Sequence, residues 1–249
     1  IRFARSVLGD PRMSQNQGLF CLSIDSLENA ENSAQLAERR QDLVQLTRQL
    51  GITANWTTSQ IPKRPALDRE LTMVIPPRLD RAQLIQVLRG ANASLAAVGE
   101  GLESAVMDPH ETRGCWDILV RQGCRVIRPR SMSATHDSSL RMIRGGLWVA
   151  PITCSFVGGS RRSVRTLFRL CQRQLNLFAD SQQLFHLNVD IANSRISWKE
   201  ELVALRSLLQ TSLELQTRGR LRLASFGELP SLLSQSNPRP MQSVLRRAA

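Results

Sequence analysis

The sequence predicts an α/β protein, a single barrel of seven or eight parallel strands surrounded by helices. The chain has 249 residues, 42% hydrophobic and 22% charged, which excludes disordered, collagen-like and disulfide-stapled small proteins. Short apolar runs alternate with segments of helical period, and this order requires parallel strands joined by crossover helices. The number of strand-helix repeats favours a closed or nearly closed barrel over an open sheet.

The apolar runs are the predicted strands. The first, residues 19–25, is a buried-strand candidate that stops at the carboxylate of Asp25. In a barrel of this class the functional site lies where strands end, so polar residues at those ends are the first candidates. The remaining runs are 52–57, 71–75, 95–98, 124–128, 147–152, 184–191 and 221–225.

The segments of helical period lie between these runs. The first has leucines on one face and stops at Gly51. The last begins with a capping-box pattern, in which the Ser197 hydroxyl and the Glu200 carboxylate are expected to satisfy amides of the first turn. The predicted helices are 35–49, 80–91, 111–122, 161–178 and 197–217.

The two ends of the chain differ from the rest in composition. Residues 1–18 are expected to lead into the barrel, which spans residues 19–233, and residues 234–249 to form a flexible basic tail. No apolar run approaches the roughly 18–20 residues of a membrane span, and no signal-peptide pattern is present. We therefore expect a cytoplasmic protein.

The chain has five cysteines, and their number and spacing predict their state. They form no C-x-x-C pair, and the odd count argues against a complete disulfide framework. We expect reduced, structural thiols.

The formal charge of +12 raises the question of an acidic partner, such as nucleic acid, an anionic membrane surface or an anionic saccharide. The clearest basic feature is a stripe on the helix at 161–178, formed by Arg161, Arg165, Arg169 and Arg173. This stripe is either a polyanion-binding surface or the solvated face of an outer helix. The aromatic interleaving of single-strand binders and the signatures of DNA-binding motifs are missing from the sequence.

Four residues at or near strand ends carry potential chemistry. Asp25 ends the first run, and Arg128 ends the run 124–128. Trp148 and His186 lie within later runs. An Asp at a strand end is often a cap, and a lone His in an apolar strand is often a core residue, so the order of the set is more informative than any member.

In this order the chain resembles the polysaccharide deacetylase family, the NodB-homology fold, over roughly residues 19–233. Where the family has a T-F-D-D-G type motif followed by a helix, Gly-Ile and an A-T-F-F type strand, this chain reads LSIDS and then GITANW. Where it has F-R-P-P, a Trp-bearing strand and L-H, this chain reads VIRP, LW and FH. The stretches are residues 22–26, 51–56, 126–129, 147–148 and 185–186, followed by a long helix and a leucine-bearing turn at 223–229.

The resemblance implies a chemistry. Family deacetylases remove acetyl from N-acetyl sugars with a divalent metal, usually zinc, held by one Asp and two His, while a second Asp acts as base and a His as acid. Carried over by position, Asp25 matches the base, Arg128 the arginine that orients it, and His186 the acid. The metal site does not carry over, because Ser26 replaces the metal-binding Asp and residues 98–103 contain no histidine.

A zinc site would therefore have to be improvised. Catalytic zinc usually needs three protein ligands and an open position. Its ligands would be Asp25, His110 and one of Glu100 and Glu103. His110 is more simply explained as a loop residue. We expect no metal cofactor unless this improvised site forms.

Two functions remain for the retained residues. Asp25, Arg128 and His186 would support hydrolysis of an amide or ester without metal, as in some members of the wider family. In the other reading the barrel binds an N-acylated saccharide or related small amide without turnover, with Glu100 lining the groove and tryptophans stacking on sugar rings. Core packing is the alternative role for each of these tryptophans, Trp56, Trp148 and Trp198. We favour binding without turnover, and the alternative class is a non-catalytic barrel that binds a polyanion through the arginine stripe.

Overall fold

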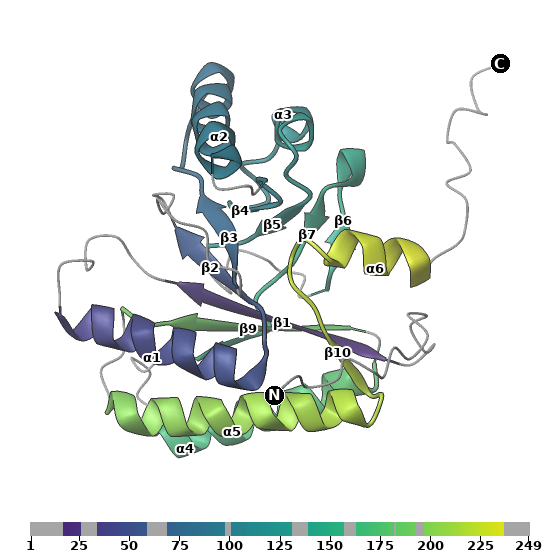
Figure 1. Cartoon of the computed structure of the whole chain (residues 1–249). Helices are drawn as coiled ribbons and strands as arrows, with labels where there is room; N and C mark the ends of the chain where they lie inside the picture. Colours follow the sequence, from purple (N-terminus) through teal and green to yellow (C-terminus); the bar gives the residue numbers. More distant parts are fainter. Residues whose placement is uncertain are drawn as a thin grey trace, which may run out of the picture.

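The computed structural model describes residues 17–25, 34–58, 69–97, 101–130, 139–156, 163–181, 183–192 and 197–236 (Figure 1). The strands of this part are β1 (Gly18–Asp25), β2 (Ala54–Thr58), β3 (Arg69–Val74), β4 (Ser104–Val106), β5 (Val126–Arg128), β6 (Arg141–Met142), β7 (Trp148–Val149), β8 (Cys154–Phe156), β9 (Leu184–Asp190) and β10 (Leu221–Leu223). The helices are α1 (Ala34–Leu50), α2 (Arg81–Ala96), α3 (Trp116–Arg121), the short 3-10 helix η3 (Arg144–Gly146), α4 (Val164–Ala179), α5 (Trp198–Thr217) and α6 (Leu229–Ser236).

These ten strands form one sheet in the order β6-β7-β5-β4-β3-β2-β1-β9-β8, and β10 pairs with β1. Every neighbouring pair in this order is parallel except that of β6 with β7. The sheet curls into a half-barrel with helices on its outer side (Figure 1). The predicted α/β barrel class is confirmed, although no pairing between the described edge strands closes the barrel.

Strand β1 lies between β2 and β9 in this sheet and separates two layers of side chains. Its alternate residues Phe20, Leu22 and Ile24 belong to the main hydrophobic core under the helices. Leu19 and Cys21 belong to a second cluster inside the curl of the sheet. Further along the same inner face come Ser23 and Asp25, so the interior changes from apolar to polar towards the carboxyl ends of the strands.

The register of β1 places Asp25 between two neighbouring strand ends. Strand β9 pairs along β1 and sets Asp25 opposite Asp190. Strand β2 pairs with the second half of β1 and sets Asp25 opposite Thr57, while β10 pairs with the first half. Because all of these pairings are parallel, their polar end residues meet at one end of the sheet.

The segment after β10 closes the opposite, amino end of the interior. The Ala224 amide donates to the Phe20 carbonyl at 2.9 Å, and the chain then turns inwards. Phe226 is fully buried and meets the ring of His186 edge-on, with centroids 5.1 Å apart. Helix α6, which the sequence patterns did not predict, follows at this end with Leu229 and Leu232 buried (Figure 1).

One predicted strand, at 95–98, is wrong. Leu95 is the last buried residue of α2, which runs to Ala96. The helix continues because Leu84, Leu88 and Leu95 keep helical spacing. The strand of this unit is instead the short, fully buried β4.

The predicted capping box of α5 is also wrong. Ser197 occupies the N-cap of α5 but makes no side-chain hydrogen bond there. A capping box forms instead at α2, where the Asp80 carboxylate accepts the Gln83 amide at 2.8 Å and the Asp80 amide donates to Gln83 Oε1 at 3.0 Å. The predicted helix 111–122 is shorter than expected, because turns occupy the residues before α3.

The expectation of uniformly reduced thiols is contradicted at one pair. Cys154 of β8 and Cys171 of α4 are joined as a disulfide, while Cys21, Cys115 and Cys124 are free and buried. The odd number of cysteines was not sufficient to exclude a disulfide, because five cysteines are compatible with one bridge and three thiols. Separately, none of the helices in the described ranges has both the length and the apolar character of a membrane span.

Candidate functional site

The carboxylate of Asp25 is surrounded by hydrogen-bond donors. Its Oδ1 accepts from Thr57 Oγ1 and from Arg128 Nη2, both at 2.6 Å. Its Oδ2 accepts from Asn188 Nδ2 at 2.9 Å and from Arg128 Nη1 at 3.2 Å. An ionised carboxylate has about four lone-pair positions, so these four bonds use its ordinary accepting capacity.

Arg128 reaches Asp25 across the interior of the curled sheet. Three strands, β2, β3 and β4, lie between β1 and β5 in the sheet, yet the two side chains form an ion pair. The Arg128 side chain is only 2% exposed, and its Nη1 also donates to Asn188 Oδ1 at 3.1 Å. A buried guanidinium of this kind requires a compensating carboxylate. Within the described residues its Nε–H has no partner.

His186 lies deeper in the interior than Asp25. It is in register with Cys21, four residues before Asp25 on β1, and its side chain is fully buried. Its Nδ1 is 3.0 Å from the Pro151 carbonyl, which can only accept, so Nδ1 carries the proton of the neutral ring. Its Nε2 then accepts from Ser23 Oγ at 2.7 Å.

Ser23 and Asn188 connect His186 to the ion pair. Ser23 Oγ is 2.7 Å from His186 Nε2 and also 2.7 Å from Asn188 Oδ1, so one hydroxyl proton serves two acceptors. Asn188 in turn donates to Asp25 and accepts from Arg128. The result is one continuous polar network inside an otherwise apolar half-barrel.

Electrostatics keep His186 neutral. Burial, reinforced by the positive charge of Arg128, lowers the pKa of His186 to about 3. The hydrogen bond to the Pro151 carbonyl and the charge of Asp25 act in the opposite direction and are outweighed. An imidazole in this state has no proton to give to a leaving group at neutral pH.

The structure therefore brings together part of the predicted set. Asp25 and Arg128 are paired directly, whereas His186 reaches them only through Ser23 and Asn188. The two-residue period of a strand could have indicated the residues that the sequence analysis missed. Ser23 lies two positions before Asp25 on β1, and Asn188 two positions after His186 on β9, so each shares a sheet face with a predicted residue. Thr57 belongs to the network for a similar reason, being opposite Asp25 in register.

The predicted tryptophans lie away from this network. Trp56 is 4% exposed and belongs to the core between the sheet and the helices, on the face of β2 opposite to Thr57. Trp148 is half-buried against the apolar cluster at the amino end. Trp198 donates its indole N–H to Asp42 at 2.8 Å, with Arg39 over its ring. None of the three offers a sugar-stacking ring beside Asp25.

Among the described members of the improvised metal set, Asp25, Glu103 and His110 form no metal-binding group. Glu103 precedes β4 and lies against Gly227 at the amino end, so it is at the opposite end of the sheet from Asp25. His110 is exposed in the turns after β4. Asp25 itself faces a guanidinium, which would repel a cation. Within the described residues, no group of three or more His, Cys, Asp or Glu side chains has the arrangement of a metal site.

Three positions singled out in the sequence fall outside the described residues, namely Ser26, Glu100 and Arg161. The other members of the arginine stripe, Arg165, Arg169 and Arg173, are exposed on α4 on the outer side of the sheet (Figure 1). They are therefore remote from the Asp25 network.

Solved structures with known names share this fold. A protein from Mycobacterium smegmatis, classed as a polysaccharide deacetylase, matches with a TM-score of 0.62 and 12% identity over 95% of this chain and 96% of its own. One from Pseudomonas aeruginosa PAO1, classed in the same way, has a TM-score of 0.65 and 10% identity over 91% and 94%. The fold is that of the polysaccharide deacetylases.

A protein named as an allantoinase, not as a deacetylase, has the same fold. The PuuE allantoinase matches with a TM-score of 0.65 and 10% identity over 96% of this chain and 100% of its own. No protein-family model and no curated protein matches the sequence. The likeness to a deacetylase-type barrel is thus one of fold, and what the site does must be argued from its own residues.

Proposed function

We propose that this protein binds an N-acylated saccharide, or a related small amide, at the carboxyl ends of its strands and does not hydrolyse it. The deacetylase fold supports the ligand class, because two of the proteins that share the fold are classed as polysaccharide deacetylases. The network around Asp25 supports the absence of turnover. Fold alone does not determine function, so the network carries the proposal.

The decisive observation is the hydrogen bonding of Asp25. A general base must direct a lone pair at the proton that it removes from the attacking water. Four donors already occupy the carboxylate. Asp25 is therefore arranged as a fixed anion.

The second requirement of hydrolysis, an acid for the leaving amine, is not met by His186. The ring is neutral and fully buried, and Ser23 occupies its Nε2. It lies two inward-facing residues below Asp25 along the strands. The imidazole is suited to holding Ser23 and Asn188 in place.

Binding uses what remains accessible. The Asp25 side chain is 17% exposed at the end of β1. Its Oδ2 makes the two longer bonds, at 2.9 and 3.2 Å, and a ligand N–H or O–H binds there by replacing the longer one, from Arg128 Nη1. A secondary amide or a sugar hydroxyl supplies such a donor.

A calorimetric titration with N-acetylglucosamine oligomers, combined with an acetate assay with and without added zinc, tests the proposal. We expect binding without acetate release. Asp25→Asn and Thr57→Val should weaken binding about tenfold, because each disturbs a hydrogen bond to a charged acceptor. Asp180→Asn, a matched change at an exposed ion pair with Arg220, should leave binding unchanged. Acetate release that Asp25→Asn abolishes would establish the hydrolase instead.

A further inference from the structure

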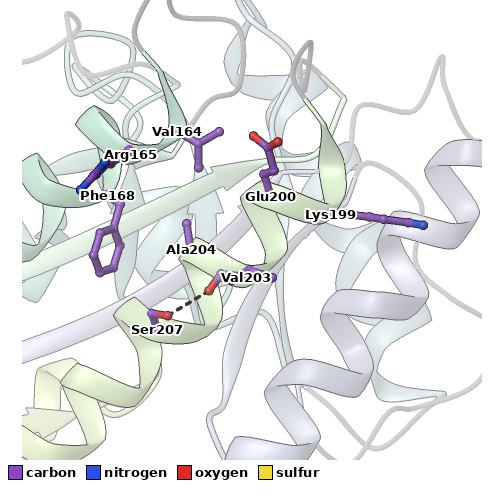
Figure 2. A pocket seen from close by; sticks show the side chains of 8 residues that line it. All are labelled: Val164, Arg165, Phe168, Lys199, Glu200, Val203, Ala204 and Ser207. Atoms are coloured by element: carbon purple, nitrogen blue, oxygen red, sulfur yellow. Dashed lines mark hydrogen bonds between the residues drawn. The ribbon is translucent and has the colours of Figure 1, made fainter.

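A groove lies between α4 and α5 on the outer side of the sheet, where the first turns of the two helices run side by side (Figure 2). Its volume is about 480 Å³. Val164 and Phe168 of α4 and Ala204 of α5 form its apolar floor. The groove exists because Ala204 is small where a larger residue would fill the space between the helices.

The rim of this groove is also apolar in part. Val203 stands on the α5 side with 65% of its surface exposed, although most valines in folded domains are buried. Ser207, one turn further, donates its hydroxyl to the Val203 carbonyl at 3.1 Å, so this hydroxyl is used within the helix. Concave apolar surface of this kind on a polar exterior is typical of interaction sites.

The charges around the groove are mainly positive. Arg165 of α4 and Lys199 of α5 lie on opposite sides of it (Figure 2). Arg169 and Arg173 continue the Arg165 ridge at intervals of four residues, and α4 contains no acidic residue. Glu200 is the carboxylate that lines the groove. The net field therefore attracts an acidic occupant.

We infer that the groove binds an acidic amphipathic helical segment of a partner protein. Apolar side chains one turn apart enter the floor at Phe168 and Ala204, and flanking carboxylates pair with Arg165 and Lys199. The stretch from Lys199 to Ser207 is about 12 Å long at 1.5 Å per residue, which suits about two helical turns of the partner.

The shape and chemistry favour a peptide over other anions. Nucleic acid would pair with the arginines but would gain nothing from the apolar floor. The groove is on the opposite side of the sheet from Asp25, so this inference does not depend on the proposed saccharide binding.

A displayed library of random helical peptides provides the probe. Peptides are selected for binding to the wild-type protein. Those that also bind the Ala204→Met variant, in which the groove is filled without a change of charge, are then removed. We expect enriched peptides that combine Asp or Glu with Leu, Ile or Phe at spacings of three and four. Enrichment of basic peptides, or none that depends on residue 204, would overturn the inference.

Synthetic versions of the enriched peptides are then measured by fluorescence anisotropy. Ala204→Met and Arg165→Glu should each weaken binding about tenfold or more, while Arg89→Glu, the same charge change at an exposed position of α2, should have little effect. Higher salt should weaken binding. Equal losses in the Arg165 and Arg89 variants, or tighter binding of single-stranded nucleic acid or anionic vesicles that displaces the peptide, would contradict a peptide site.

Discussion

Arg128 determines how the interior of the half-barrel is organised. Its side chain crosses from β5 to β1 and meets Asp25, Asn188 and Thr57. A buried charge that loses its partner is far more costly than one that is removed together with it. The stability of the network therefore depends on the pair as a unit.

Separating this pair gives a first test. Asp25→Asn should lower the free energy of unfolding by about 3 kcal/mol, because it leaves the Arg128 guanidinium buried without a counter-charge. The double variant Asp25→Asn/Arg128→Met should recover part of that loss, since no uncompensated charge remains. Urea unfolding measures both. Additive losses in the double variant would show that the two residues act independently.

The buried imidazole gives a pH dependence. In the unfolded chain the pKa of His186 is near 6.5, whereas burial and Arg128 lower it to about 3 in the folded protein. Between these values the unfolded state binds more protons, so stability should fall as the pH is lowered, by up to about 1.4 kcal/mol per pH unit. His186→Gln should be less stable at pH 7.5 but decline less steeply between pH 6.5 and 4. An unchanged slope in urea unfolding would contradict the assignment.

A second group whose titration affects stability, Glu70, lies at the amino end of the sheet. Burial raises the pKa of Glu70, the nearby Glu103 and Glu228 add to the effect, and hydrogen bonds from Ser225 and Gly227 oppose it. The protonated form is favoured on folding, so this stability is present below pH 4.5 and lost as the pH rises through the raised pKa. Glu70→Gln should make the protein more stable than the wild type at pH 8. Glu38→Gln, at an exposed position of α1, serves as the control when the two variants are compared by thermal unfolding.

At the scale of elements, hydrophobic period was sufficient for the long helices and strands. Strands β1 and β9 and helices α1, α4 and α5 follow from it within a few residues. The missed β4 and β8 have only three residues each, too few for a period to appear. Helix α6 was missed because its buried leucines follow a turn that only the tertiary fold directs into the amino end.

The bridge between β8 and α4 is the element-scale prediction. Cys154 and Cys171 are 17 residues apart, and cross-linking a loop of that length stabilises by about 3 kcal/mol in the chain-entropy model. Dithiothreitol should lower the melting temperature of the wild type to that of Cys154→Ser/Cys171→Ser, and should have no effect on that variant. A reductant effect that persists in the double variant would assign the stabilisation elsewhere.

At the scale of the whole molecule, the order of Asp25, Arg128 and His186 along the chain was enough to indicate the deacetylase-type barrel, which the structural comparisons confirm. The contents of the site were less predictable. Depth within the barrel depends on register, so the sequence did not reveal that His186 lies below Asp25. The sequence likewise did not reveal which face of the sheet Trp56 occupies. Its side chain lies in the core between the sheet and the helices.

Equilibrium dialysis of the whole protein against N-acetylglucosamine oligomers, with mass analysis of the sugar in both chambers, tests the central claim most directly. This experiment measures sugar binding and acetyl removal in the same sample. The fixed Asp25 carboxylate and the neutral, buried His186 lead us to expect sugar enriched in the protein chamber with every acetyl group intact. Sugar that is not enriched, or that has lost acetyl groups, would contradict binding without hydrolysis.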